Sequence, residues 1–240
     1  MVRSGARVAD VGCDHGYLGI HLLQEGTAAF VAALDLRSGP LAKARQNAVR
    51  FGTADRMFFA VCDGLEALEA GTVDTVVCAG MGGDTIAKIL DRCPWAGDER
   101  LSLILQPQSS GNDLRRWLGE NGFSILREPL VRDGGFLYTA IEARYGGGKP
   151  VSPGRQYVSR QLLDGEPALV RDYLKRVIAG IHRAVDGIAR ARSDTDAQRR
   201  EYYEAALREV LEMEEEYENR IADHRCTVSA GTGLHEGRLG

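Results

Sequence analysis

A chain of 240 residues, 44% of them hydrophobic and 27% charged, is long enough for one large domain with a smaller one attached, and it is neither disordered nor collagen-like. Its net charge of −4 does not suggest a nucleic-acid binder, no apolar run approaches the roughly 18–20 residues of a membrane span, and no secretory signal opens the sequence. The five cysteines form no C-x-x-C pair, so we expect a cytoplasmic protein with no disulfides, no bound metal and no membrane partner.

Short apolar runs alternate with amphipathic stretches through the first part of the chain. The runs are short enough to be strands buried on both faces, and they lie at residues 7–13, 30–36, 57–62, 73–79 and 101–106. Helical patterns lie at residues 18–24, 40–51, 64–70, 85–93 and 113–121. Two further strands, 124–131 and 135–143, are joined by the turn signal Arg132-Asp133-Gly134. Five βα units and a terminal hairpin predict a seven-stranded, Rossmann-like α/β domain over residues 1–148.

Helical periodicity replaces this alternation after a glycine-rich linker at residues 146–150. Apolar residues recur every three or four positions through residues 170–188 and again through 203–221. Between the two stretches, Thr195 and Gln198 form a capping-box signal. We therefore expect an antiparallel, coiled-coil-like helical hairpin over residues 149–225 and a flexible tail over 226–240.

Charge divides unevenly between the two helices of this hairpin. Residues 155–192 carry eight basic and four acidic side chains, whereas residues 193–225 carry five basic and eleven acidic ones. The basic stretch is suited to bind phosphates, although two solvated helix faces that attract each other explain the same pattern. The basic side chains with the reach to contact phosphates are Arg155, Arg160, Arg171, Lys175, Arg176 and Arg183.

A glycine loop follows the first predicted strand and reads Asp10-Val11-Gly12-Cys13-Asp14-His15-Gly16. A dinucleotide-binding fold has G-x-G-x-x-G here, so that the backbone can approach a pyrophosphate. Two carboxylates would repel a pyrophosphate and attract the ammonium and sulfonium groups of S-adenosylmethionine. The loop therefore favours S-adenosylmethionine over NAD, with an ordinary βα turn capped by an aspartate as the alternative.

Two further acids follow the next two predicted strands. Asp35 stands where doubly wound nucleotide folds place a carboxylate on the ribose hydroxyls, and it precedes Leu36. Asp63 could accept the exocyclic amine of an adenine, with Gly64 leaving room for it. Each aspartate alone could cap a helix. Acids at three successive strand ends instead indicate a ligand site, because ligands bind at that edge of a parallel sheet.

The fourth and fifth predicted strands end in turns that could position a methyl acceptor. Gly80, Met81 and Gly82 permit close backbone approach and leave room for a flat base, although a tight βα turn is the simpler explanation. Gln106 and Gln108 carry amides that can bind a base edge, or in the case of Gln108 point to solvent. A ring nitrogen such as adenine N1 brings its own lone pair, so we assign no general base. His15 is either part of the cofactor site or structural.

Several of these motifs together resemble the bacterial tRNA adenine-N1-methyltransferases that modify adenine 22, the TrmK family. The resemblance is carried by VADVGCDHGYLGIHL (8–22), ALDLRSGPLAKARQN (33–47), DGLEAL (63–68), VVCAGMGG (76–83), LILQPQ (103–108) and LRRWLGENGF (114–123). It implies a class I methyltransferase with S-adenosylmethionine as the methyl donor and tRNA as the acceptor. It also implies that Asp10, Gly12, Asp14, Asp35, Asp63 and Gly80 to Gly83 line the cofactor pocket.

The sequence departs from the family in three places. Members usually have a basic helix before the first strand, which here begins at about residue 7; Gln108 stands where asparagine is usual, and Gly135 where lysine is usual. The family reading therefore leaves two alternatives for the function. These are a methyltransferase of a protein or small molecule, and a non-catalytic S-adenosylmethionine-binding scaffold whose hairpin docks a protein.

The sequence thus predicts three sets of site residues in a monomeric enzyme. Cofactor binding is assigned to Asp10, Gly12, Asp14, His15, Gly16, Asp35, Leu36, Asp63, Gly64, Gly80 and Met81. Acceptor positioning is assigned to Gly80, Met81, Gly82 and Gln106. Binding of tRNA is assigned to the six basic residues of the hairpin.

Overall fold

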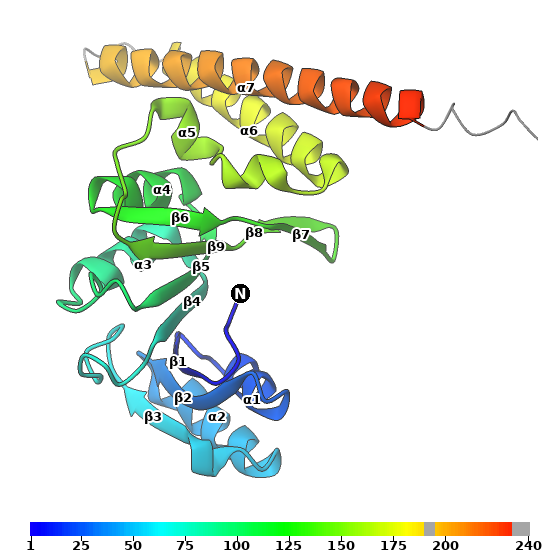
Figure 1. Ribbon diagram of the computed structural model, residues 1–240. Helices are drawn as coiled ribbons and strands as arrows, with labels where there is room; N and C mark the ends of the chain where they lie inside the picture. Colours follow the sequence, from blue (N-terminus) through cyan, green and yellow to red (C-terminus); the bar gives the residue numbers. More distant parts are fainter. Residues whose placement is uncertain (190–194, 232–240) are drawn as a thin grey trace, which may run out of the picture.

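The computed structural model describes residues 1–189 and 195–231, with side chains described for 1–188 and 197–223. Residues 1–145 form a central seven-stranded sheet flanked by helices, and the helical region lies across one end of it (Figure 1). The first part runs through β1 (Ala6–Val11), α1 (Tyr17–Gln24), β2 (Ala28–Asp35), α2 (Ser38–Arg50), β3 (Met57–Val61), β4 (Thr75–Gly82), α3 (Gly83–Asp91), β5 (Ser102–Ser109) and α4 (Gly111–Glu120). It ends in β6 (Phe123–Arg127), β7 (Leu130–Asp133), β8 (Phe136–Thr139) and β9 (Ile141–Tyr145).

The sheet has the strand order β3-β2-β1-β4-β5-β9-β6. Strands β1 to β5 are parallel, and β9 is antiparallel to both of its neighbours, β5 and β6. The order reverses at β1 and β4, and ligands bind at such a switch point, beyond the carboxyl ends of the strands. The predicted fold class is confirmed.

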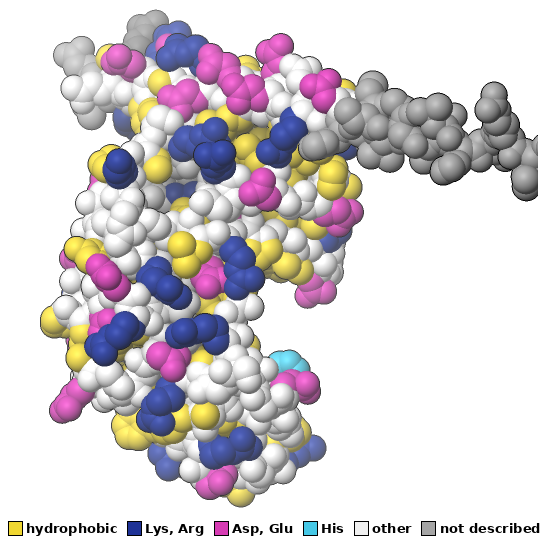
Figure 2. All heavy atoms as spheres, in the orientation of Figure 1, with side chains coloured by type: hydrophobic (Ala, Val, Ile, Leu, Met, Phe, Trp, Pro, Cys, Tyr) yellow, Lys and Arg dark blue, Asp and Glu magenta, His cyan; other side chains and the backbone are white. Residues whose placement is uncertain are grey.

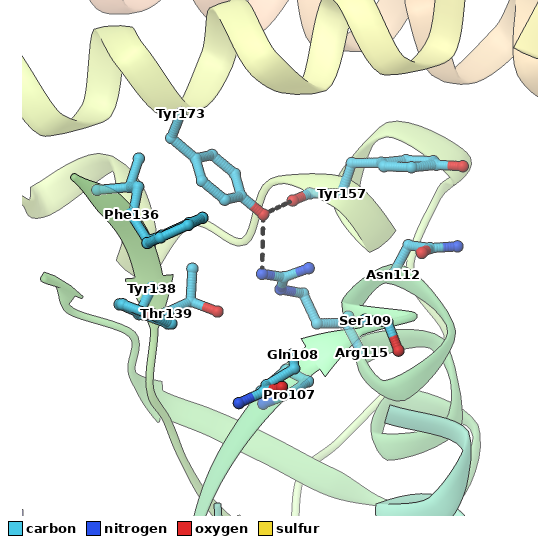
Figure 3. A pocket seen from close by; sticks show the side chains of 12 residues that line it. Pro107, Gln108, Ser109, Asn112, Arg115, Phe136, Tyr138, Thr139, Tyr157 and Tyr173 are labelled. Atoms are coloured by element: carbon cyan, nitrogen blue, oxygen red, sulfur yellow. Dashed lines mark hydrogen bonds between the residues drawn. The ribbon is translucent and has the colours of Figure 1, made fainter. Parts of the chain in front are cut away.

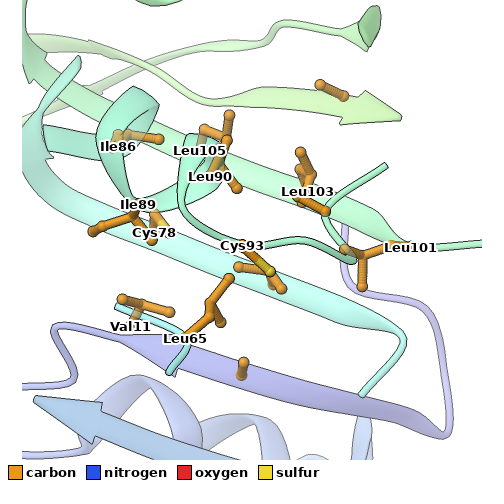
Figure 4. Packing of buried hydrophobic residues seen from close by; sticks show 14 of the residues in the cluster. Val11, Leu65, Cys78, Ile86, Ile89, Leu90, Cys93, Leu101, Leu103 and Leu105 are labelled. Atoms are coloured by element: carbon orange, nitrogen blue, oxygen red, sulfur yellow. The ribbon is translucent and has the colours of Figure 1, made fainter. Parts of the chain in front are cut away.

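Alternate residues of the buried strands pack on opposite faces of the sheet. Val8 of β1 packs with the apolar faces of α1 and α2, whereas Ala9 and Val11 pack with those of α3 and α4. Figure 4 shows the second of these clusters, in which Ile86 and Leu90 of α3 lie on β4 and β5. Burial on both faces explains why these strands read as continuous apolar runs.

The helix predicted over residues 64–70 is absent, and the segment forms turns. Gly64 and Gly71 bound it with left-handed φ angles of 66° and 80°. Leu65 and Leu68 still pack into the core from this segment. A helix-like spacing of two leucines is therefore satisfied by turns, because the left-handed backbone at Gly64 and Gly71 is incompatible with a right-handed helix through these positions.

Each of the two long strands predicted at the end of the sheet domain is broken into two. Pro129 has no backbone N–H and cannot donate a hydrogen bond to a neighbouring strand, and the chain leaves the main sheet between β6 and β7. Strands β7 and β8 form a separate two-stranded sheet that projects from the domain (Figure 1). The predicted turn is present, with Gly134 and Gly135 both at left-handed φ. Only β6 and β9 join the main sheet.

The C-terminal region consists of α5 (Pro153–Tyr157), α6 (Pro167–Ala189) and α7 (Thr195–Gly231), with a 3-10 turn at Gln161–Asp164. Helices α6 and α7 are antiparallel, since Arg171 near the start of α6 binds Glu218 far along α7. Their shared core includes Val170, Leu174 and Val210. The two predicted helices are present, and their supercoiling stays a prediction. The predicted tail boundary at residue 226 is wrong, because α7 continues to Gly231. The rest of the predicted tail, residues 232–240, lies outside the described residues, and the predicted capping box at Thr195 lies outside the described side chains.

Within the described ranges, no helix is both long and apolar enough to cross a membrane. Cys13, Cys62, Cys78 and Cys93 are free thiols. In the same part of the chain, no cluster of three or more His, Cys, Asp or Glu side chains could hold a metal ion.

Candidate cofactor and acceptor cavities

A cavity of about 620 Å³ opens at the carboxyl edge of β1 to β4. It brings together residues that the sequence places at the ends of four different strands. From the predicted cofactor set, its lining includes Gly12, Asp14, Asp35, Leu36, Asp63, Gly64, Gly80 and Met81. Asp10, His15 and Gly16 are not among its lining residues. The parallel sheet thus assembles most of the predicted site at its switch point.

Asp35 ends β2 with its carboxylate held in a fixed position. One oxygen accepts the backbone N–H of Asp14 at 3.1 Å, and the other accepts that of Arg37 at 2.9 Å. The residue is 6% exposed. A carboxylate oxygen can accept two hydrogen bonds, so each oxygen retains one acceptor site towards the cavity. Asp35 is therefore preorganised to accept two hydroxyl donors of a ligand.

Asp10 lies beneath the loop rather than in the cavity. Its carboxylate is buried beside the backbone N–H of Gly19 on α1, and its Oδ2 has no hydrogen-bond partner among the described residues. Burial, together with the nearby charge of Asp35, raises the pKa of Asp10 to about 7. Desolvation disfavours the ionised form, so burial weakens the negative charge that Asp10 presents, and its role toward a ligand stays a prediction. The carboxylates that line the cavity itself are Asp14, Asp35 and Asp63.

The rest of the glycine loop shapes the entrance to α1. Asp14 adopts a left-handed φ of 48°, and its carboxylate lies 3.3 Å from Nδ1 of the half-exposed His15. Gly16 has a φ of 73°, and a Cβ there would lie 2.9 Å from the Cβ of Ala44 on α2. Gly16 therefore permits close packing of the loop against α2 and does not line the cavity.

Asp63 lines the cavity as an ion pair with Arg92, whose Nη1 lies 2.7 Å from the carboxylate. The hydrogen bond from Arg92 lowers the pKa of Asp63. The pair is partly exposed, and one carboxylate oxygen is engaged by the guanidinium. The other oxygen is available to a ligand amine. The sequence pointed to Asp63 but not to Arg92, which follows α3 and is remote from every motif.

The turn after β4 is braced by β5. Gly80 has a left-handed φ of 77°, and its N–H donates to Oε1 of Gln106 at 2.9 Å. Gln106 therefore supports the turn, and the expectation that its amide contacts the acceptor is not supported by this arrangement. A Cβ on Gly12 would lie 2.9 Å from Cε of Met81, so the two residues meet across the cavity wall. Gly82 precedes α3 as its N-cap.

A second cavity, of about 460 Å³, lies between the end of β5, the start of α4, the β7–β8 hairpin and the helical region. Figure 3 shows Phe136 and Tyr138 on one side, Gln108 below, Asn112 on the other side and Tyr173 above. Sequence reasoning missed the aromatic residues here, since they come from segments far apart in the chain. The only signal was the position of Gln108 at a strand end.

A buried ion pair closes one wall of this second cavity. Nε of Arg115 donates to both carboxylate oxygens of Glu128 at 3.1 Å, and its Nη2 donates to the hydroxyl of Tyr173 at 3.1 Å. Its Nη1 donates to the carbonyl of Gln156 at 3.0 Å. Burial alone would lower the pKa of Arg115, but the attraction of Glu128 raises it overall. The network joins α4 of the sheet domain to α5 and α6.

The six basic residues predicted to bind RNA are not equivalent. Arg171 forms two hydrogen bonds with Glu218 of α7, so its charge is already paired with a carboxylate within the hairpin. Arg155 and Arg160 line a separate cavity of about 250 Å³ beside the linker. The other three, Lys175, Arg176 and Arg183, are exposed on α6. Figure 2 shows basic side chains beside the acidic ones of α7 and also over the face of the sheet domain.

The chain belongs to the Methyltransferase domain family, which matches residues 1–141. The match covers the whole sheet up to the start of β9, including every residue that lines the first cavity.

Several individual proteins are also similar to this chain. The tRNA (adenine(22)-N(1))-methyltransferase of Bacillus subtilis is 31% identical over 149 residues, which cover 60% of this chain and 61% of that protein. The chain thus spans about three fifths of the length of the curated relatives it matches. A proposed tRNA (m1A22) methyltransferase of Streptococcus pneumoniae, solved with S-adenosyl-L-methionine, is 28% identical with a TM-score of 0.67, over 86% of this chain and 94% of that one. A Streptococcus agalactiae protein of the NADB-Rossmann superfamily is 27% identical with a TM-score of 0.74, over 88% and 91%. These likenesses agree with the resemblance to the TrmK family.

Proposed function

We propose that the protein transfers a methyl group from S-adenosylmethionine to N1 of an adenine in tRNA, at position 22. The observation that carries the proposal is the cavity at the switch point, where Asp35, Asp63 and the turn at Gly80 meet in a chain of the methyltransferase-domain family. The relatives support it, since the Bacillus subtilis protein is named for this reaction and the Streptococcus pneumoniae structure holds this cofactor.

The residues of the first cavity fit this cofactor. Asp35 would accept the two ribose hydroxyls with its remaining acceptor sites, and Asp63 would accept the adenine amine beside Gly64. Gly12, Gly64 and Gly80 all have left-handed φ angles that favour glycine, and a Cβ on Gly12 or Gly64 would lie 2.9 Å from Met81 or Ile89 in the cavity wall. Asp14 would attract the positive charge of the methionine part.

The bound cofactor supplies an electrophilic methyl group, and the chain supplies positioning. N1 of adenine attacks with its own lone pair, so no side chain has to remove a proton before transfer. Gln106 holds Gly80 in the geometry that shapes the transfer edge. Fixing the two reactants in line contributes most of the rate in such a reaction. N1 lies on the Watson–Crick edge, so the base has to be unpaired or flipped out, at a cost of about a few kcal/mol.

Binding of tRNA is proposed for the exposed basic residues of α6, namely Lys175, Arg176 and Arg183. Arg155 and Arg160 would contribute near the linker, and Arg171 less, because Glu218 already binds it. The monomeric state and the cytoplasmic location stay predictions.

The test is a primer-extension assay on unmodified tRNA incubated with the protein and S-adenosylmethionine. A stop at one adenine, with 1-methyladenosine found by mass spectrometry of the digested RNA, is expected for the wild type, and at limiting S-adenosylmethionine the stop should be weaker for Asp35→Ala. Binding of S-adenosylhomocysteine without any methylation of tRNA would overturn the proposal. Methylation of a protein or small molecule would then favour the alternative enzyme, and none at all would favour the scaffold.

A further inference from the structure

We infer that the second cavity holds the acceptor adenine, stacked on Phe136 and bound by the amide of Gln108. The inference rests on the proposed function and assigns its acceptor site. Three of the cavity's properties carry it: its position beside the cofactor cavity, its lack of free charge, and its exposed aromatic wall.

Gln108 links the second cavity to the first. It lines the second cavity, and its Nε2 lies 3.8 Å from the position that a Cβ on Gly80 would occupy. Gly80 in turn lines the cofactor cavity. A ligand held by Gln108 therefore lies next to the turn at Gly80, which borders the cofactor cavity and is where the methyl group has to pass.

The charge of the second cavity suits a neutral ligand. Its lining contains no Asp, Glu, Lys or His, and its one charged residue is Arg115. The Arg115 guanidinium is already bound by Glu128, Tyr173 and the carbonyl of Gln156, so it offers little to an added anion. The volume of about 460 Å³ lies within the range of small-molecule sites, roughly 300–1,000 Å³. A phosphate or an acidic side chain is disfavoured, and a flat uncharged base fits.

The β7–β8 hairpin presents an aromatic surface to the cavity. Phe136 is 66% exposed, and its ring lies 6.4 Å from that of Tyr138 at an angle of 46°. Aromatic side chains at this exposure are the usual platforms for unpaired bases. Arg132 at the end of β7 pairs with Asp172 of α6, which ties the hairpin to the helical region. The hairpin leaves the main sheet at Pro129, and this departure brings Phe136 over the end of β5.

The amide of Gln108 explains why adenine would be accepted through one edge only. A glutamine amide pairs bidentately with N6 and N7 of adenine. Binding at that edge leaves N1, on the adjacent Watson–Crick edge, free to attack the methyl group. Guanine presents an acceptor in place of the N6 amine and would leave the amide mismatched.

The experiment compares Phe136→Ala, Phe136→Tyr and Gln108→Ala with a matched control, Phe58→Ala. Phe58 is also exposed, at 43%, and lies on β3 at the opposite end of the sheet. Each variant is assayed for methylation of unmodified bacterial tRNA, for S-adenosylhomocysteine affinity by calorimetry, and for its thermal midpoint.

We expect Phe136→Ala and Gln108→Ala to lower kcat at least tenfold. KM for tRNA should change less than twofold, because phosphate contacts elsewhere supply most of the affinity. Phe136→Tyr should restore most of the activity, whereas Phe58→Ala should behave as wild type. Cofactor affinity and thermal midpoint should be unchanged in all four.

The outcomes separate this inference from the proposed function. If the wild type methylates tRNA and Phe136→Ala and Gln108→Ala match Phe58→Ala, the acceptor site lies elsewhere and the inference is wrong. A parallel loss of cofactor affinity would also overturn it, since that result indicates a structural role. If the wild type binds S-adenosylhomocysteine but methylates no tRNA, the proposed function fails, and the inference fails with it.

Discussion

Replacing Glu128 with glutamine should destabilise the protein more than any change to an exposed ion pair. The side chain of Glu128 is fully buried, and that of Arg115 is 2% exposed. Glu128→Gln leaves the shape of the side chain intact but removes the negative charge that binds the buried Arg115 guanidinium. Removing one partner of a buried pair costs about 3–5 kcal/mol, because the other charge stays desolvated. We expect a loss of about 3 kcal/mol or more in the free energy of unfolding.

The matched control is Asp172→Asn, which removes the partner of Arg132. This pair also joins the hairpin region to α6, but its side chains are 39% and 47% exposed. Exposed pairs contribute about 0–1 kcal/mol. Urea denaturation followed by circular dichroism gives both values under the same conditions. A loss below 1 kcal/mol for Glu128→Gln would refute the claim that Arg115 depends on this carboxylate. The double variant Arg115→Met/Glu128→Leu should recover part of the loss, because it leaves no unpaired charge.

Three further predictions follow from the cofactor loop and from α6. Asp35→Ala should weaken S-adenosylhomocysteine binding at least tenfold by calorimetry, since two hydroxyls lose their acceptor at about 1–3 kcal/mol each, and unchanged affinity would remove Asp35 from the site. The folded-state pKa of Asp10 is raised from 3.8 to about 7, so the folded protein retains a proton that the unfolded chain releases, and stability falls as pH rises between these values. Asp10→Asn should therefore stabilise the protein by about 2–3 kcal/mol more at pH 8 than at pH 5 in urea denaturation, and equal effects would contradict the raised pKa. Lys175, Arg176 and Arg183 replaced together by Glu should weaken tRNA binding and reduce its log–log salt slope by about 0.7–0.9 per lost contact, whereas an unchanged slope would move the RNA surface off α6.

The sheet could be predicted from sequence because its signals are local. Five apolar runs mark strands buried on both faces, and acids or glycines at their ends mark the switch-point edge. The same locality explains the errors. A spacing of two leucines between Gly64 and Gly71 does not distinguish a short helix from turns, and Pro129 separates β6 from β7 in a stretch that otherwise reads as one strand.

Burial of individual polar groups could not be predicted in the same way. Asp10 and Asp14 are equivalent in the sequence motif, yet Asp10 is buried against Gly19 and Asp14 lines the cavity. Gln106 and Gln108 are two residues apart on β5 and also have different surroundings. Gln106 accepts a hydrogen bond from Gly80, whereas Gln108 lines the second cavity. The second cavity itself depends on contacts between residues as distant in the chain as Arg115 and Tyr173, which are 58 positions apart. Periodicity along the chain carries no information about such contacts.

The helical region contributes to the second cavity as well as to the basic surface. All residues that line the first cavity precede residue 90, whereas Tyr157 and Tyr173 of the second cavity come from α5 and α6. A chain ending at residue 148 would therefore keep every proposed cofactor ligand but lose a wall of the acceptor cavity and two of the partners of Arg115. If this shortened chain did not methylate tRNA, the result would not show whether the phosphate contacts or the acceptor cavity had been lost. Charge reversals on the exposed face of α6 make that distinction, because they leave Tyr173 and the buried network in place while they change the interaction with tRNA phosphates.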